Sequence, residues 1–179
     1  MTSPPRSSSD FYLHEDDWGM IALEADENRV DRARVVGQAA AHAEAHRAPD
    51  GIGWTAMYVA PEPKVALATR AITVGALAGA LGPDWTPFAT VTSGYSTYRE
   101  PVAQGYAFVF GPDRHAVIYG TRDRELVTAL CLVHPVPALA ATLYRLGTTF
   151  RLILCDLWRD VTVELASPSA VARYLADDE

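Results

Sequence analysis

Two histidines one helical turn apart have a spacing that could bind a metal. His42 and His46 lie in the segment His42-Ala43-Glu44-Ala45-His46, and an i, i+4 pair places two imidazoles on one helix face. The zinc-protease pattern needs a glutamate directly after the first histidine, but Ala43 stands there. Histidines near the C-terminal end of a helix are also favoured by the helix dipole. The sequence therefore predicts a solvated helix face, with no metal and no cofactor.

A cluster of carboxylates follows the first apolar segment. Glu15, Asp16 and Asp17 come directly after His14, and such a cluster could bind Mg²⁺ or raise the pKa of its own members. Neighbouring residues of a strand or turn point in different directions, so adjacency alone does not build a chelating site. We therefore expect a solvated acidic turn.

The segment Gly94-Tyr95-Ser96-Thr97-Tyr98 shares a glycine and a central serine with the nucleophile elbow of hydrolases. Tyr98 stands where the elbow needs its second glycine, so the strained turn that exposes the serine is not encoded. His115 or His134 could still approach a serine in the fold, because catalytic triads occur in any chain order. No catalytic residue is predicted from this segment.

Residues 84–100 combine aromatic and charged side chains in an irregular sequence that predicts a loop. Tyrosine, tryptophan and arginine carry much of the binding energy at interfaces, and loops on a rigid scaffold often carry function. The alternative is a long loop pinned to its own domain by Trp85 and Phe88. The predicted binding residues of this loop and of the acidic turn are Glu15, Asp16, Asp17, Trp18, Trp85, Tyr95, Tyr98 and Arg99.

The N-terminal half should position these residues with short strands and one long helix. Apolar residues at 10–14 and 18–23 flank the acidic turn and predict a β-hairpin. Residues 54–59 predict a buried strand, residues 65–72 an extended segment, and Thr73 the cap of a helix to Leu81. A helix is expected over residues 26–47, and its predicted apolar stripe is Val30, Ala33, Val36, Gly37, Ala40 and Ala43.

The C-terminal half predicts a meander of three strands at residues 102–110, 115–120 and 126–133. A helix over residues 138–146 should end at Gly147, and strands at 150–157 and 161–165 should pair. Ser167-Pro168 starts a helix to about Ala176. The expected core contains Val36, Ala40, Trp54, Leu77, Phe108, Ile118, Leu132, Leu152 and Leu154.

These elements predict an α+β fold with a mainly antiparallel sheet and about four helices, because strands come in runs and helices between them. We expect a single domain over residues 10–179, preceded by a disordered tail over residues 1–9. Residues 65–81 are the most apolar window, but Arg70, Thr73 and two glycines interrupt it, so no membrane span is predicted. Absence of a signal-peptide pattern and two cysteines in apolar stretches predict a cytoplasmic protein.

Acidic residues are concentrated at the two ends of the chain. Residues 1–31 contain eight acids against two arginines, and the last three residues are all acidic, although the net charge of the whole chain is only −7. An acidic protein is a poor ligand for nucleic acid, whose affinity depends on lysine and arginine. A basic protein partner is electrostatically more suitable. We expect the two acidic ends to form one surface.

The leading hypothesis is a small protein-binding module that neutralises or regulates another protein, a profile shared in general by immunity and antitoxin proteins. One alternative is an enzyme or small-ligand binder with a pocket of dispersed residues, namely His14, Asp16, Tyr95, Arg99 and His115. A further alternative is a structural homodimer that buries one sheet face.

Overall fold

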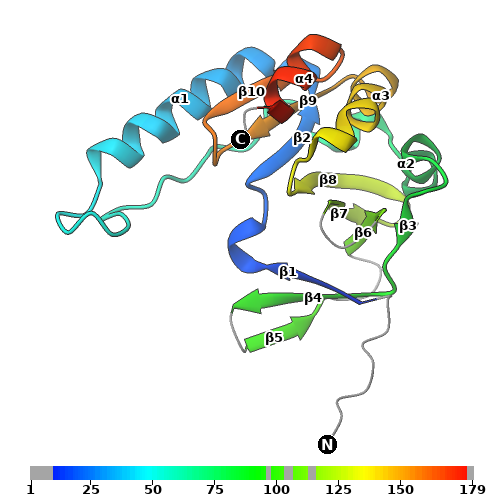
Figure 1. Ribbon diagram of the computed structural model, residues 1–179, viewed down its shortest axis with the longest axis horizontal. Coiled ribbons are helices and arrows are strands. Elements are labelled where there is room, and N and C mark those ends of the chain that lie inside the picture. The colour runs from blue at the N-terminus through cyan, green and yellow to red at the C-terminus, as the bar shows by residue number, and fades with distance from the viewer. Residues whose placement is uncertain (1–9, 96–97, 103–106, 113–115, 177–179) are drawn as a thin grey trace, which may run out of the picture.

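A seven-stranded sheet forms the middle layer of the molecule, with helices on one face and a second, three-stranded sheet on the other (Figure 1). The structure is a computed structural model that describes residues 10–95, 98–102, 107–112 and 116–176. Its four α-helices and two mainly antiparallel sheets confirm the predicted α+β fold.

The large sheet has the strand order β10-β9-β2-β8-β7-β6-β3, and all its neighbours pair antiparallel. Its strands are β2 (Ile21–Ala25), β3 (Thr86–Pro87), β6 (Ala107–Gly111), β7 (Val117–Asp123), β8 (Leu126–Val133), β9 (Leu152–Asp156) and β10 (Val161–Glu164). In β7, Ile118 packs under the helices, whereas Val117 and Tyr119 pack under the small sheet. Where both faces are buried, as at residues 117–120 of β7 and 130–133 of β8, these strands carry almost only apolar side chains.

The small sheet has the order β1-β4-β5, formed by β1 (Asp10–His14), β4 (Thr90–Tyr95) and β5 (Tyr98–Pro101). β1 runs parallel to β4, and β4 runs antiparallel to β5. Phe11, Leu13 and Val91 point inward and form a second core with β6, β7 and β8.

The helices are α1 (Arg29–Ala45), α2 (Val74–Leu81), α3 (Ala140–Phe150) and α4 (Pro168–Ala176), with short 3-10 turns at Glu15–Asp17 (η1), Asp26–Asn28, Leu67–Arg70 and Pro137–Leu139. As predicted, the Thr73 side chain caps α2 by accepting a hydrogen bond from the Ala76 amide at 3.0 Å. Ser167 caps α4 in the same way through the Ala170 amide, and Pro168 is the first residue of that helix.

The predicted apolar stripe of α1 is wrong at most of its positions, since Val36 is the single member of it that is buried. Val30 is 80% exposed, and the buried residues of the helix are Arg32, Val35 and Val36. Half of the predicted stripe consists of alanines. Burial of an alanine side chain contributes little hydrophobic free energy, so alanines do not determine which face of a helix turns inward. Arg32 can lie inward because its guanidinium bonds the buried Glu24 carboxylate at 2.7 Å.

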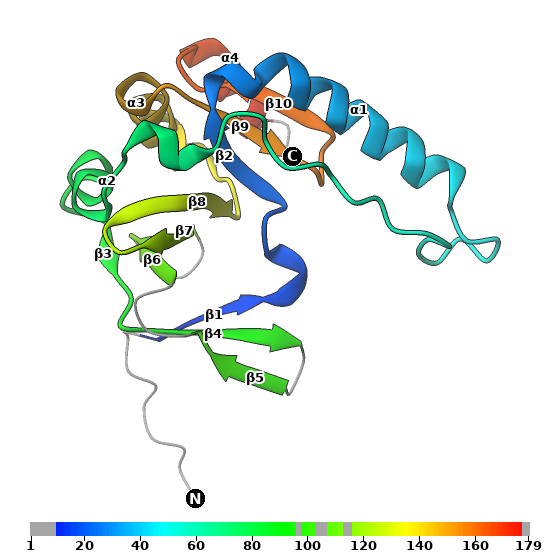
Figure 2. The same cartoon turned by 180° about the vertical axis from the view of Figure 1, so that it is seen from behind.

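The predicted buried strand at residues 54–59 is also wrong. Trp54 is 61% exposed, and residues 57–66 contain no strand. This part of the chain runs back along α1 (Figure 2), where Asn28 bonds both the amide and the carbonyl of Val65 at 2.9 Å. Residues 65–72, predicted as an extended segment, contain the 3-10 turn Leu67–Arg70.

Most of the other predicted core residues are buried. Ala40 is only half-buried, and the buried ones are Val36, Leu77, Phe108, Ile118, Leu132, Leu152 and Leu154.

Two further predictions about chain pairing are wrong. Residues 10–14 and 18–23 do not form a hairpin, because β1 joins the small sheet and β2 lies between β8 and β9 in the large one. Residues 84–100, expected as a loop, contain β3, β4 and the start of β5. β1 and β2 find their partner strands far along the chain, where local patterns carry no signal. β4 pairs with the distant β1 and also with the adjacent β5, a local hairpin that the irregular sequence of residues 84–100 did not reveal.

The meander β6-β7-β8 and the pairing of β9 with β10 are confirmed. Gly147 does not end its helix as predicted, since α3 continues to Phe150. A Cβ on Gly147 would lie 2.4 Å from the Cβ of Leu165. This glycine therefore permits close packing of the chain after β10 against α3.

Candidate functional site

The parallel pairing of β1 with β4 brings the acidic turn beside the β4–β5 hairpin. His14, the last residue of β1, lies opposite Gly94, and the next residue of β4 is Tyr95. The rings of His14 and Tyr95 meet edge to face, with centroids 5.1 Å apart. Residues eighty positions apart in the chain thus form one continuous surface.

Tyr12 and Arg99 link the two outer strands of this surface. The guanidinium carbon of Arg99 lies 3.8 Å from the centre of the Tyr12 ring, a cation–π contact. The Tyr12 hydroxyl donates a hydrogen bond to the Gly94 carbonyl at 2.9 Å. Gly94 has φ +146°, and a Cβ there would lie 2.1 Å from the Tyr98 carbonyl oxygen, so only glycine fits. Sequence reasoning missed Tyr12, although its place in a β-strand beside His14 was visible.

The acidic turn η1 presents two carboxylates to solvent. Glu15 and Asp16 are exposed, and the Asp16 amide donates a hydrogen bond to Nδ1 of His14 at 3.3 Å. The Asp16 carboxylate lies 3.5 Å from the same nitrogen. Asp17 is half-buried and lies on the other side of the turn, where it lines a pocket.

Trp18 and Tyr119 hold the acidic turn in place. The Trp18 indole donates to the Ser93 hydroxyl at 2.6 Å, and its ring meets Tyr119 edge to face at 5.1 Å. The Tyr119 hydroxyl donates to the Asp17 carbonyl at 2.7 Å and accepts from the Gly19 amide at 2.8 Å. Burial raises the pKa of Tyr119 far above its ordinary value, so the phenol keeps the proton that it donates.

Two tyrosines project from the hairpin into solvent. Tyr95 is 58% exposed and Tyr98 is 72% exposed, and the two are paired across β4 and β5. The Tyr98 hydroxyl donates to the Glu100 carboxylate at 2.8 Å, and this hydrogen bond raises the pKa of Tyr98. We call the surface formed by Tyr12, His14, Glu15, Asp16, Tyr95, Tyr98, Arg99 and Glu100 the acidic–aromatic face.

The predicted binding residues divide into three groups in the structure. Glu15, Asp16, Tyr95, Tyr98 and Arg99 lie together on the acidic–aromatic face. Trp18 lies half-buried beneath them, and Asp17 faces away toward the pocket. Trp85 lies apart from this surface, buried in the core under the helices.

Other predicted residues take no part in this surface or lie outside the described residues. His115, Ser96, Thr97 and Asp177 to Glu179 fall outside the described ranges, so the expected union of the two acidic ends stays a prediction. The rings of His42 in α1 and of His46, the C-cap of that helix, lie tilted to each other with centroids 4.1 Å apart. Within the ranges described, no three side chains of histidine, cysteine or acidic type form a group suited to a metal ion.

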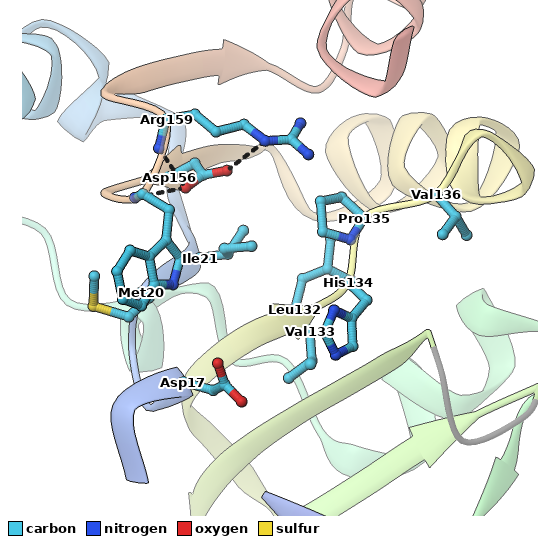
Figure 3. A pocket seen from close by; sticks show the side chains of 11 residues that line it. Asp17, Met20, Ile21, Leu132, Val133, His134, Pro135, Val136, Asp156 and Arg159 are labelled. Atoms are coloured by element: carbon cyan, nitrogen blue, oxygen red, sulfur yellow. Dashed lines mark hydrogen bonds and ion pairs between the residues drawn. The ribbon is translucent and has the colours of Figure 1, made fainter. Parts of the chain in front are cut away.

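The pocket beside Asp17 lies between η1, β2, the end of β8 and the β9–β10 turn, and has a volume of about 420 Å³ (Figure 3). Asp156 lies in its wall with a fully buried carboxylate. That carboxylate accepts hydrogen bonds from the amides of Trp158 and Arg159 and from the Tyr174 hydroxyl, and pairs with the Arg159 guanidinium at 3.7 Å. Asp156 therefore closes the β9–β10 turn and attaches it to α4.

Comparison of the chain with protein-family models, curated proteins and solved structures found no match. Of the helices formed by the described residues, none combines the length and the apolar character that a membrane span requires.

Proposed function

We propose that this protein is a binding module for another protein, and that the acidic–aromatic face is its docking surface. The observation that carries the proposal is the exposure of Tyr95 and Tyr98 on paired strands, beside Glu15 and Asp16. Tyrosine is enriched at interface hot spots because it offers a large contact area with few rotatable bonds. A ring of charged residues around aromatic anchors is the usual anatomy of a transient interface.

The charges of this face favour a basic partner. Glu15, Asp16 and Glu100 are exposed carboxylates, and against these three the Arg99 guanidinium, which lies over the Tyr12 ring, supplies one positive charge. Complementary charge chiefly accelerates association and selects the partner, whereas buried aromatic contacts slow dissociation. A neutralising or regulating role of the immunity or antitoxin type fits a module of this kind.

A cytoplasmic location belongs to the same proposal. Cys131 and Cys155 are free thiols, each buried in the core. Free thiols without disulfides are typical of a reducing compartment.

The test begins with partners captured from the source cell by the wild-type chain and identified by mass spectrometry. Affinity and association rate of a captured partner are then measured for wild type, for Glu15→Lys/Asp16→Lys and for Tyr98→Ala. We expect the charge reversal to slow association about tenfold at low salt and to reduce the dependence on salt. Tyr98→Ala should weaken affinity about fivefold or more through faster dissociation.

The matched control is Glu62→Lys/Asp84→Lys. It changes the net charge by the same amount at exposed residues away from the face, and should leave association nearly unchanged. Equal association rates for wild type and the Glu15→Lys/Asp16→Lys variant would overturn the proposed docking surface.

A further inference from the structure

The pocket beside the acidic turn has an apolar floor and a half-exposed aromatic wall. Ile21, Leu132 and Val133 are buried residues that line it, and Trp158, 55% exposed, belongs to the same lining. Its volume of about 420 Å³ lies within the range of about 300–1,000 Å³ typical of ligand pockets. The floor can bury an aliphatic stem, and an exposed indole can stack on a planar cation.

The charges that line the pocket do not balance. The buried Asp156 carboxylate is matched by Arg159, whose guanidinium also donates to the Tyr174 carbonyl and lies over the Tyr174 ring. Asp17 is different, because no hydrogen bond or ion pair reaches its carboxylate from the residues that the structure describes. In Figure 3 this carboxylate is turned toward the side of the pocket that carries His134. One negative charge is left over, so a monovalent cation would make the pocket neutral.

Arginine suits these features better than lysine does. Its planar guanidinium can bond a carboxylate with two parallel N–H groups and can stack on an aromatic ring at the same time. An ammonium group is more strongly hydrated and gains less from a half-buried, partly apolar site. His134 adds ring nitrogens that can accept or donate a further hydrogen bond.

The pocket adjoins the docking surface proposed above. Asp17 is the last residue of η1, whose first two residues belong to the acidic–aromatic face. The same tyrosine, Tyr119, fixes the backbone of the turn on both sides of Trp18. One partner could therefore cover the face and insert a side chain beside Asp17.

We propose, on the basis of the function proposed above, that this pocket receives an arginine side chain of the protein partner, with Asp17 as its carboxylate and Trp158 as its stacking surface. Such a residue would be the anchor of the interface, because a desolvated arginine in a pocket is a common hot spot. Glu15 and Asp16 would then serve mainly to steer the partner into place.

The experiment needs no partner. The ¹⁵N-labelled protein is titrated by NMR with the peptide acetyl-Gly-Arg-Gly-amide and with its citrulline analogue, which keeps the shape of arginine but carries no charge. We expect the arginine peptide to shift the Trp158 indole signal and the Met20 and Ile21 amides saturably, with a dissociation constant on the order of millimolar. The citrulline peptide should bind at least about fivefold more weakly, since it lacks the charge that Asp17 selects.

Two variants test whether binding of the arginine peptide depends on the Asp17 carboxylate. Asp17→Asn should weaken the arginine peptide about fivefold and leave the citrulline peptide unchanged, whereas Asp84→Asn, at an exposed site elsewhere, should change neither. Equal binding of the two peptides, no shift of these signals at about 20 mM peptide, or unaltered binding by a folded Asp17→Asn variant would each overturn the anchor. Loss of partner binding in Glu15→Lys/Asp16→Lys together with any of these results would refute the anchor and keep the docking face.

Discussion

Removal of a single hydroxyl, in Tyr119→Phe, tests whether the acidic turn is held by the bonds described above. The phenol makes two hydrogen bonds to the turn, to the Asp17 carbonyl and from the Gly19 amide, while its ring packs against Trp18. Phenylalanine keeps the ring contact and loses both bonds, each of which contributes about 0.5–1.5 kcal/mol net. Gly19 is exposed, so water can replace part of the loss. We expect the free energy of unfolding to fall by about 1–2 kcal/mol.

The assay is urea denaturation followed by tryptophan fluorescence, combined with the arginine-peptide titration. Tyr144→Phe is the control, because the same atom is removed from an exposed tyrosine of α3. It should change stability by less than about 0.5 kcal/mol. In Tyr119→Phe the arginine peptide should also bind more weakly, since Asp17 is no longer fixed. A stability change below about 0.5 kcal/mol with unaltered peptide binding would show that Tyr119 does not position the turn.

Two further predictions concern the interior. Arg32→Met leaves the Glu24 carboxylate buried without its cation, so we expect a loss of about 3–5 kcal/mol in the free energy of unfolding, and Glu24→Leu/Arg32→Met should recover much of it. Full stability of the single variant in denaturant titrations would contradict this account. Burial raises the pKa of the Cys131 and Cys155 thiols to about 11, which leaves at least about a hundredfold less thiolate at pH 8 than in an ordinary cysteine. A disulfide reagent should therefore react rapidly with both thiols only after denaturation. Rapid reaction of the native protein would refute the burial of these thiols.

Local chemistry in the sequence was enough to predict the elements that begin and end with a distinctive residue. Thr73 and Ser167-Pro168 mark the starts of α2 and α4. Leu126–Val133 is recognisable as a strand because it is an apolar run that follows a short charged turn. α1 was placed correctly, but its inward face was not, because the ion pair of Arg32 with Glu24 outweighs the alanine pattern. The sequence alone does not reveal that Arg32 of α1 meets a carboxylate, that of Glu24, in β2.

The candidate site was predictable only as a set of residue types. Tyr95, Tyr98 and the acidic turn were singled out from composition, but their meeting depends on β1 pairing with β4, which no local pattern encodes. Trp85 has the same residue type as an interface anchor and lies in the core instead. The role of Asp156 was missed altogether, since its partners, Tyr174 and Arg159, come from the following helix and turn.

The parallel pairing of β1 with β4 also has a consequence for the way this molecule opens. Asp10 lies opposite Thr90, so the pairing closes a loop of eighty residues. Most strands of the large sheet, β6 to β10, come after the small sheet in the sequence. Closing such a loop costs chain entropy, and a three-stranded sheet with one packed face has little to offset that cost. We expect the small sheet to separate from the rest as a unit of its own, at a lower free energy than global unfolding. A ligand bound across β1, β4 and β5 would hold the ends of that loop together, and its binding free energy would be added directly to the stability of this unit.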